Sequence, residues 1–229
     1  MNVVAIIPAR MESSRFFGKP LKEICGMPMI GHVYKRTKMC DLLSEVYVAT
    51  CNQEIIDYIE LIGGKAIMTG DFHERASDRV AEALQIIESK TKKNIDIIVM
   101  VQGDEPMIDP NMIVDGVEPL LKKPEFGVTN LMCSIKTKEE WKDPNEVKVV
   151  VDNKNFALYF SREAIPSSKK YDKNITAYKQ VCIISFKRND LINYCSIKPS
   201  PLEIIESVDM NRLLENNQKI KMILTDKLT

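Results

Sequence analysis

The sequence is short of histidine and has no closely paired cysteines. Only two histidines, His32 and His73, accompany six cysteines, and no two cysteines form a C-x-x-C pair. A structural zinc site needs clustered cysteine and histidine ligands, so we do not expect one. Scattered cysteines of this kind are typical of small buried side chains in a reducing compartment.

Long hydrophobic runs and an excess charge of one sign are also missing. No stretch reaches the roughly 18 apolar residues that a transmembrane helix needs, and Met1 leads into a predicted strand without a signal peptide. The 32 basic residues balance 32 acidic ones. We therefore expect a cytoplasmic protein that binds neither nucleic acid nor membranes, with any anion bound locally.

Alternating strands and helices are predicted over the first part of the chain. Apolar runs predict strands at residues 3–7, 45–50, 65–69 and 95–101, and amphipathic segments between them predict helices. In one of these helices, Ser77 or Asp78 is the predicted N-cap. The order is typical of an α/β fold with a doubly wound, mainly parallel sheet, Rossmann-like in type. The most apolar run, 95–101, is expected at its centre.

In the second part of the chain the regular alternation of strands and helices gives way to a predicted β-hairpin. Apolar runs flank Asp152-Asn153-Lys154-Asn155, which is typical of a β-hairpin. Further predicted elements are a loop at 167–174, a strand at 181–186, a helix at 202–216 and a strand at 219–225. We divide the chain into an α/β core at 1–135, a smaller hairpin-containing insertion at 136–200 and a return to the core at 201–229.

A basic loop follows the first predicted strand. Between Pro8 and Lys19 the chain carries Arg10, Arg15 and Lys19, while Glu12 is its only acidic residue. Open α/β sheets place ligands at the carboxyl ends of central strands. Three cations and main-chain N–H groups suit a polyphosphate. The plain alternative is a solvated basic loop.

A carboxylate follows the central strand in the segment VQGDEP at 101–106. If both strands are central, Asp104 and Gln102 lie beside the basic loop. Mg²⁺ is often held by one or two carboxylates together with phosphate oxygens. The two loops together therefore predict a metal–nucleotide site, although the second alone would indicate an ordinary turn. A dehydrogenase or a P-loop hydrolase is disfavoured because neither glycine motif is present.

These motifs resemble those of the sugar cytidylyltransferases, above all the 3-deoxy-manno-octulosonate (Kdo) type. The shared segments are PAR at 8–10, SSR at 13–15, GKP at 18–20, VQGDEP at 101–106, VKVV at 147–150, ALYFSR at 157–162 and PSPLE at 199–203. The resemblance runs nearly end to end. It implies that the anomeric hydroxyl of a 3-deoxy-2-keto sugar acid attacks the α-phosphate of CTP, with Mg²⁺ as cofactor and pyrophosphate as leaving group.

The resemblance also implies roles for individual residues. The catalytic residues would be Arg10, Lys19 and Asp104, with Asp104 as the metal ligand. Nucleotide contacts would come from Ala9, Arg10, Ser13, Arg15, Lys19, Arg79 and Gln102. Sugar contacts would come from Arg162, Gln180, Glu203 and Glu206. Without the resemblance, Arg162 would be a surface arginine and the two glutamates a solvated helix face. The insertion would bind the sugar and form a homodimer, and the product would serve lipopolysaccharide or other cell-envelope polysaccharide synthesis.

Departures from the family pattern leave the acceptor open. Arg75-Ala76-Ser77-Asp78-Arg79 stands where the family has Ser-Gly-Thr-Glu-Arg, and Gln180 and Ile184 replace a histidine and a tyrosine. The segment 209–212 is also altered. The family's second metal-binding aspartate, in a Val-Asp-x-Pro-Glu motif, has no counterpart up to Thr229. Either the chain is shortened relative to its parent, or the site works with one metal carboxylate, or it is inactive. The acceptor could be Kdo, 8-amino-Kdo or a sialic-acid-like acid, and a binding protein without turnover is a further alternative.

Overall fold

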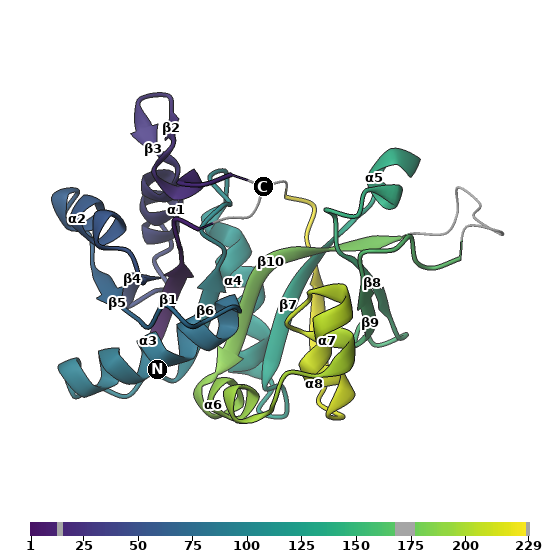
Figure 1. The fold of residues 1–229 in the computed structure, drawn as a ribbon. Helices are drawn as coiled ribbons and strands as arrows, with labels where there is room; N and C mark the ends of the chain where they lie inside the picture. The colour runs from purple at the N-terminus through teal and green to yellow at the C-terminus, as the bar shows by residue number, and fades with distance from the viewer. Residues whose placement is uncertain (13–15, 168–176, 228–229) are drawn as a thin grey trace.

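The structure is a computed structural model that describes residues 1–12, 16–167 and 177–227. Within these residues, seven strands follow one another across a sheet in the order β11-β7-β10-β6-β1-β4-β5, and β8 and β9 extend it beside β10 (Figure 1). The strands are β1 (Val3–Pro8), β4 (Glu45–Thr50), β5 (Ala66–Met68), β6 (Ile97–Val101), β7 (Val128–Ser134), β8 (Lys148–Val151), β9 (Ala157–Ser161), β10 (Tyr178–Lys187) and β11 (Ile220–Leu224). A separate hairpin pairs β2 (Glu23–Ile24) with β3 (Met27–Pro28).

The α-helices and one short 3-10 helix connect these strands. They are η1 (Lys19–Leu21), α1 (Met29–Lys38), α2 (Gln53–Leu61), α3 (Ala76–Thr91), α4 (Pro110–Lys122), α5 (Lys138–Lys142), α6 (Arg188–Ser196), α7 (Pro201–Glu206) and α8 (Asn211–Glu215). None of the described helices is long and apolar enough to cross a membrane.

The sheet is mixed but mainly parallel, which confirms the predicted fold class. β1 pairs in parallel with β4 and β6, and β11 in parallel with β7. Along this path of described strands, β10 alone is antiparallel to its neighbours, β6 and β7. β6 lies at the middle of the order, as its apolar sequence predicts.

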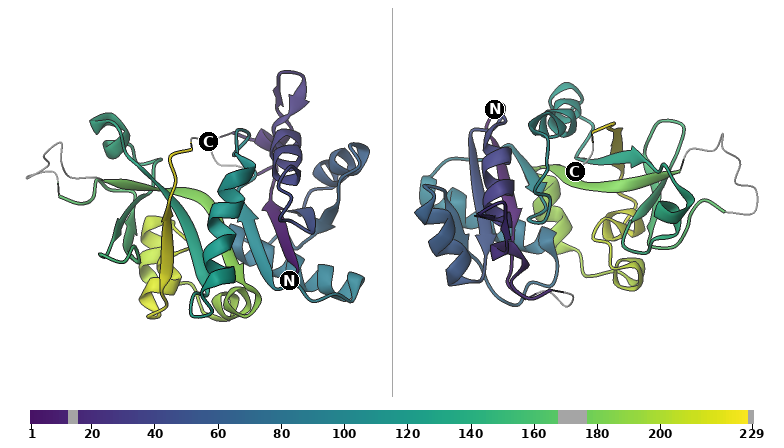
Figure 2. Two further views of the ribbon diagram at one scale, coloured as in Figure 1. Left: turned by 180° about the vertical axis from the view of Figure 1, so that it is seen from behind. Right: turned by 90° about the horizontal axis from the view of Figure 1, so that it is seen from above.

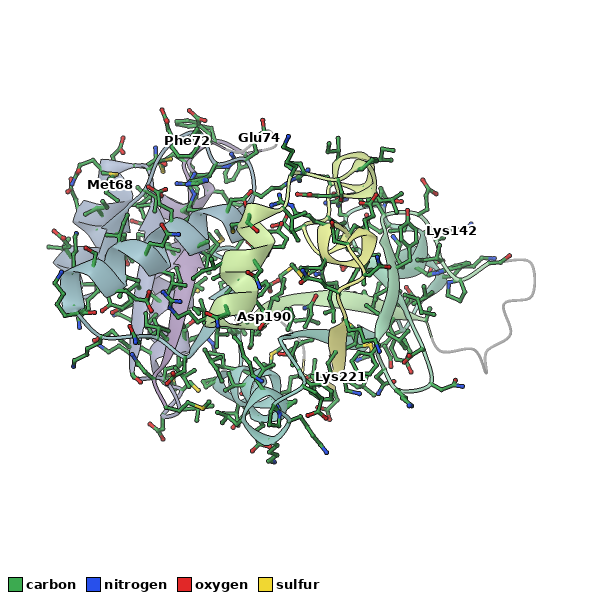
Figure 3. The ribbon with its side chains drawn as sticks, turned by 90° about the horizontal axis from the view of Figure 1, so that it is seen from below. Met68, Phe72, Glu74, Lys142, Asp190 and Lys221 are labelled. Carbon is green, nitrogen blue, oxygen red and sulfur yellow. The ribbon has the colours of Figure 1, made fainter. Side chains whose placement is uncertain are left out.

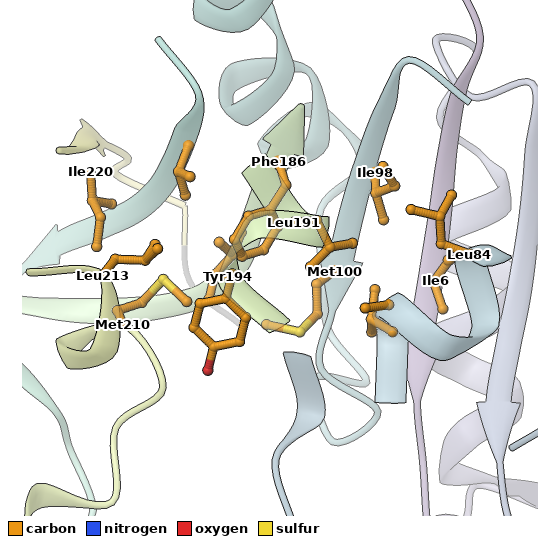
Figure 4. Close-up of a cluster of buried hydrophobic side chains, with 14 of the residues drawn as sticks. Ile6, Leu84, Ile98, Met100, Phe186, Leu191, Tyr194, Met210, Leu213 and Ile220 are labelled. Atoms are coloured by element: carbon orange, nitrogen blue, oxygen red, sulfur yellow. The ribbon is translucent and has the colours of Figure 1, made fainter. Parts of the chain in front are cut away.

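Helices cover both faces of the sheet, so its central strands are buried on both sides. Every residue of β1 and β6 is buried. On one face, α3, α6 and α8 pack against the strands through a core that includes Ile6, Leu84, Met100, Phe186 and Leu213 (Figure 4). On the other face, α1, α2 and α4 form a second core (Figure 2). This double burial explains why the strands are continuous apolar runs rather than alternating ones.

The structure corrects two local predictions and adds a strand. The helix predicted at 202–216 is two helices, because Ser207 adopts a left-handed conformation (φ 53°) that ends α7. Arg75, not Ser77 or Asp78, is the N-cap of α3. Ser77 and Asp78 lie inside the first helical turn, where each bonds to a residue far along the chain. The strand β7 was not predicted.

The proposed insertion at 136–200 is not a separate unit. Its last strand, β10, lies between β6 and β7 in the centre of the sheet. Only α5 has a small core of its own, around Trp141. The hairpin β8–β9 joins the sheet through β10 and packs into a main core with Val149 and Phe160 (Figure 1). The predicted hairpin itself is present, with Val149 opposite Phe160. Apart from Ser167, the predicted loop at 167–174 lies outside the described residues.

Candidate active site

The ends of β1 and β6 meet at one edge of the sheet. The two strands are adjacent and parallel, with Ile6 opposite Met100. A Cβ atom added to Gly103, just beyond β6, would stand 2.7 Å from the carbonyl oxygen of Pro8 at the end of β1. Glycine therefore permits this close approach, and the loops after the two strands border one site.

Lys19 and Asp104 form an ion pair across this site. The Lys19 Nζ atom is 2.8 Å from Oδ2 of Asp104, and the two side chains are 40% and 51% exposed. An ion pair this exposed contributes only about 0–1 kcal/mol to stability. Lys19 can therefore leave Asp104 at little cost when an anion with more charge, such as a triphosphate, is offered to it.

A cavity of about 750 Å³ opens beside this ion pair, and we call it the first cavity. Its lining residues include Ala9, Arg10, Glu12, Phe16, Lys19, Gln102, Gly103, Asp104 and Asn145. Arg10 and Lys19 supply two cations to it, and Gln102 an amide. The structure thus brings together the predicted residues of both loops. Ser13 and Arg15, also predicted here, lie outside the described residues.

A smaller side cavity of about 190 Å³ shares Ala9, Arg10 and Gln102 with the first cavity. Its other wall is the loop between β5 and α3, where Phe72 and Glu74 lie at the far side of the molecule from Lys142 (Figure 3).

Arg79 holds this loop in place. It is only 3% exposed, and its guanidinium donates to Thr69 Oγ1 at 2.6 Å and to the carbonyl oxygen of Gly70 at 3.0 Å. Glu82 accepts from the Gly70 N–H at 2.9 Å and also bonds to the His73 ring. Arg79 therefore shapes the side cavity through the loop, while a direct contact with a nucleotide stays a prediction.

Arg75, which stands where the family has a serine, reaches from the side cavity to α7. Its Nη1 donates to Ser207 Oγ at 2.9 Å, and its Nε lies 3.4 Å from a carboxylate oxygen of Glu203. The longer side chain thus ties the β5–α3 loop to the second half of the chain.

A second cavity, of about 400 Å³, adjoins the first. The two share Gln102, Asp104 and Asn145. The remaining wall of the second cavity includes Glu105, Glu146, Arg162, Lys179, Gln180, Cys182 and Lys227. Its three cations are matched by three carboxylates, Asp104, Glu105 and Glu146. The cavity therefore suits a polar ligand that carries both hydroxyls and a charged group.

Two of the predicted sugar-binding residues, Arg162 and Gln180, line the second cavity. Arg162 Nε donates to the carbonyl oxygen of Glu206 at 2.9 Å, and its Nη1 to that of Pro144 at 3.0 Å. Gln180 Nε2 donates to Asn130 Oδ1 at 2.6 Å. These bonds fix both side chains at the cavity wall.

Lys179 is a cation of this wall that the sequence interpretation did not single out. Burial alone would lower its pKa, but hydrogen bonds to Glu140 at 2.8 Å and Glu146 at 3.1 Å raise it. The ammonium is therefore charged at neutral pH. Burial raises the pKa of the neighbouring Cys182 thiol, so Cys182 is not a thiolate nucleophile there.

Glu206 supports the wall from behind. Its carboxylate accepts from Tyr159 OH and Ser161 Oγ, each at 2.8 Å, and from the Arg162 N–H at 2.9 Å. Although partial burial would raise its pKa, these hydrogen bonds lower it below its ordinary value. Burial and the bond to Glu206 raise the pKa of Tyr159 to about 12. Glu206 was predicted to contact the sugar, but it lines neither cavity. It is instead an ionised group that anchors Arg162.

Glu203 does not form a solvated face with Glu206. Its side chain is fully buried and forms an ion pair with Arg212 at 2.6 Å. It also caps α7 together with Ser200 in a capping box. Glu203 lines neither of the two cavities. The structure therefore places it in the framework of the fold, away from the groups that would meet a sugar.

The side chains of the first cavity suit a metal ion that takes most of its coordinating oxygens from a bound nucleotide. Asp104 offers an exposed carboxylate at the junction of the two cavities. No group of three or more His, Cys, Asp or Glu side chains suited to a metal ion occurs among the described residues. This arrangement matches Mg²⁺, which is commonly bound by one or two carboxylates and the phosphate oxygens of a nucleotide.

Solved structures show the same fold. A 4-diphosphocytidyl-2C-methyl-D-erythritol synthase from Anaerococcus prevotii aligns with a TM-score of 0.59 at 11% identity, over 98% of this chain and 89% of that one, and shares the fold alone. A CMP:2-keto-3-deoxy-manno-octonic acid synthetase complexed with CTP aligns with a TM-score of 0.88 at 36% identity, over 98% of this chain and 90% of that one. Fold and site together define an α/β nucleotidyltransferase.

Sequence comparisons narrow this class. A family model described as cytidylyltransferase matches residues 4–220. The 3-deoxy-manno-octulosonate cytidylyltransferase of Geotalea uraniireducens is 40% identical over 236 residues, which cover 99% of this chain and 92% of that protein. The protein of the same name from Syntrophus aciditrophicus is 40% identical over 224 residues, covering 98% and 89%. The chain belongs to the cytidylyltransferase family, in its 3-deoxy-manno-octulosonate cytidylyltransferase group.

Proposed function

We propose that this protein transfers CMP from CTP to the anomeric hydroxyl of 3-deoxy-manno-octulosonate or a close 2-keto sugar acid and releases pyrophosphate. The observation that carries the proposal is the pair of adjoining cavities, which meet at Asp104. One has the cations for a triphosphate and the other the cations for a carboxylate. The relatives' names and the CTP complex of the similar synthetase supply the nucleotide and the acceptor.

The first cavity binds the nucleotide in this proposal. Arg10 and Lys19 hold the phosphates and stabilise the negative charge that builds up on the departing pyrophosphate. Lys19 exchanges its bond to Asp104 for a phosphate oxygen, which frees the carboxylate for a cation. Ala9, Gln102 and the loop held by Arg79 border the space left for the ribose and base.

Asp104 is the proposed ligand of Mg²⁺, which when bound polarises the α-phosphate and favours ionisation of the attacking hydroxyl. The protein itself contributes by positioning the two substrates. With no covalent enzyme intermediate, the rate depends on holding the hydroxyl in line with the α-phosphate and on electrostatic stabilisation.

The second cavity binds the acceptor acid. Arg162 and Lys179 suit its carboxylate, while Gln180 suits its hydroxyls. Because Gln180 replaces the family's histidine and Ile184 its tyrosine, the acceptor is the part of the proposal that an assay has to resolve. The product would enter lipopolysaccharide or other cell-envelope polysaccharide synthesis.

The test is a pyrophosphate-release assay with four nucleoside triphosphates against Kdo, 8-amino-Kdo and a sialic acid, with and without Mg²⁺. We expect release with CTP and one of the 3-deoxy-2-keto acids, and only in the presence of Mg²⁺. Binding of CTP by calorimetry without release for any acid would instead indicate a binding protein. No binding of any nucleotide would refute the site itself.

We also propose that the protein forms a homodimer through the hairpin region. Leu158 of β9 is 61% exposed, and Ile204 and Ile205 of α7 are 59% and 77% exposed. The two elements are neighbours, joined by the bond from Tyr159 to Glu206, and a contiguous apolar patch is the surface feature that marks an interface between subunits. Sedimentation equilibrium would detect the dimer, and a monomer at micromolar concentration would contradict it.

A further inference from the structure

The turn at residues 143–146 borders the place where the two substrates would meet. Three residues line both cavities, namely Gln102, Asp104 and Asn145. Gln102 and Asp104 follow β6 and were predicted to act on the nucleotide. Asn145 comes from a different part of the chain, between α5 and β8, and neither its position nor a role for it was predicted.

A buried cation holds this turn. Lys148 of β8 is completely buried, and its ammonium donates to three carbonyl oxygens: those of Asp143 at 2.7 Å, Glu146 at 2.6 Å and Arg162 at 2.6 Å. Since an ammonium has three N–H groups, this set satisfies it fully. The turn is thereby joined to Arg162, the residue that follows β9.

Further bonds fix the turn itself. Asp143 Oδ1 accepts from the Asn145 N–H at 2.8 Å and from its Nδ2 at 2.9 Å. Arg162 Nη1 donates back to the carbonyl oxygen of Pro144. The position of Asn145 is therefore set by several independent bonds before any ligand arrives, which is the arrangement that transition-state stabilisation requires.

We propose that Asn145 is a substrate-contacting residue of the transfer reaction, at the junction of the nucleotide and acceptor cavities. This proposal rests on the proposed function. A carboxamide there can donate to an oxygen of the transferred phosphoryl group or of the incoming acceptor without adding a charge next to Asp104. Its contribution grows as negative charge develops between the two substrates, so it acts on the rate more than on CTP affinity.

The chain contains a matched control for this proposal. The tripeptide Asp143-Pro144-Asn145 recurs as Asp109-Pro110-Asn111 at the start of α4. Asn111 makes the same two bonds to Asp109, at 2.8 and 3.0 Å, but lines neither cavity. If the asparagine only stabilises a turn, its replacement should have the same effect at both positions.

The experiment compares Asn145→Ala with Asn111→Ala in the full chain. We expect Asn145→Ala to lower kcat by on the order of 10² while the Kd for CTP, measured by calorimetry, changes by less than about threefold. Asn111→Ala should leave kcat within about twofold of the wild type. Equal effects of the two variants, or a loss that follows the fraction of unfolded protein, would overturn the proposal.

Two further measurements keep the outcome clear. Should Asn145→Ala fail to fold, Asn145→Ser, whose hydroxyl can still donate to Asp143, is put through the same comparison. If the wild type releases no pyrophosphate with any acceptor, the proposed function fails, and this inference with it. If the wild type is active and Asn145→Ala is equally active, only the role of Asn145 fails.

Discussion

Arg212 Nη2 lies 2.6 Å from Oε1 of Glu203, and the two side chains are 1% and 0% exposed. The same guanidinium reaches Asp78 of α3 at 3.1 Å and stacks over the Tyr194 ring at 4.2 Å. Burial alone would lower the pKa of Arg212, but the bonds to the two carboxylates raise it. This buried cluster joins α3, α7 and α8 on one face of the sheet.

Glu203→Gln is expected to destabilise the fold, because it leaves the Arg212 charge buried without its main partner. Loss of one member of a buried ion pair costs about 3–5 kcal/mol. The free energy of unfolding, measured in urea, should fall by that order. In the fraction that remains folded, the KM for the acceptor should stay near the wild-type value. A raised KM with unchanged stability would show that Glu203 contacts the sugar after all.

Lys19→Ala is expected to weaken CTP binding and to leave stability almost unchanged. The lost contact is a charge-assisted hydrogen bond to phosphate, worth roughly 10- to 100-fold in affinity, whereas the exposed bond to Asp104 adds little to the fold. Calorimetry with CTP and the KM for the acceptor separate the two substrates. Lys22→Ala, in the same segment but outside the first cavity, is the control. An equal loss for both substrates would contradict the phosphate role.

Asp104→Asn is expected to abolish activity while the circular dichroism spectrum and melting temperature stay those of the wild type. The amide keeps the shape of the side chain but lacks the charge that a Mg²⁺ ligand needs. Asp109→Asn, at the other end of the same loop, retains an N-cap residue and should retain activity. An Asp104→Asn enzyme with a near-normal rate and the same Mg²⁺ dependence would remove Asp104 from the metal site.

Lys148→Met is expected to lower the free energy of unfolding by roughly 2–4 kcal/mol, because three carbonyl oxygens lose a buried donor. Burial lowers the pKa of this ammonium, which shows that the buried charge is itself unfavourable. Its removal therefore offsets part of the stability lost with the three hydrogen bonds. Lys187→Met is the control, since Lys187 also donates to carbonyl oxygens, those of Lys123 and Pro124, but at the surface. Similar losses in both variants would show that burial of Lys148 is unimportant.

Glu206→Gln is expected to make stability less dependent on pH in the acid range. The pKa of Glu206 is lowered in the fold, so its contribution is complete above its unfolded value and is lost as pH falls through the folded value. The stability difference between wild type and Glu206→Gln should therefore be complete above the ordinary glutamate pKa of about 4.3 and shrink as the pH falls below it. Unfolding in urea across this range measures it. A difference that is constant with pH would contradict ionisation of Glu206.

The sequence predicted the central half of the fold because local patterns determine it there. The buried strands β1 and β6 are unbroken apolar runs, and Asp109 caps α4 as its type suggests. The strand β7 was missed because its apolar residues are interrupted by Thr129 and Asn130, both fully buried. Asn130 donates across to carbonyl oxygens of β10, a partner that no local pattern reveals.

In the site, too, local patterns could be predicted and contacts with distant residues could not. The residues that follow β1 and β6 could be placed together because parallel neighbouring strands end at one edge of a sheet. The break at Ser207 and the bonds of Ser77 and Asp78 could not be foreseen, since their partners Asp209 and Arg212 lie 132 and 134 residues away. The resemblance assigned Glu203 to the sugar, and spacing alone would have made it part of a solvated helix face. Neither could reveal its buried partner Arg212.

The antiparallel strand β10 limits how such an enzyme can be re-engineered. Its Cys182 carbonyl accepts from the Gln102 N–H beside the nucleotide cavity, while Lys179 and Gln180 of the same strand line the acceptor cavity. A chimera that exchanges residues 136–200 with a relative would import a central strand together with the acceptor pocket, and would disturb the host's triphosphate loop. A transplant that stops before Tyr178 exchanges the outer strands β8 and β9 but leaves β10 of the host in place. Altered acceptor choice is therefore better sought by substitutions within β10 than by grafting the whole segment.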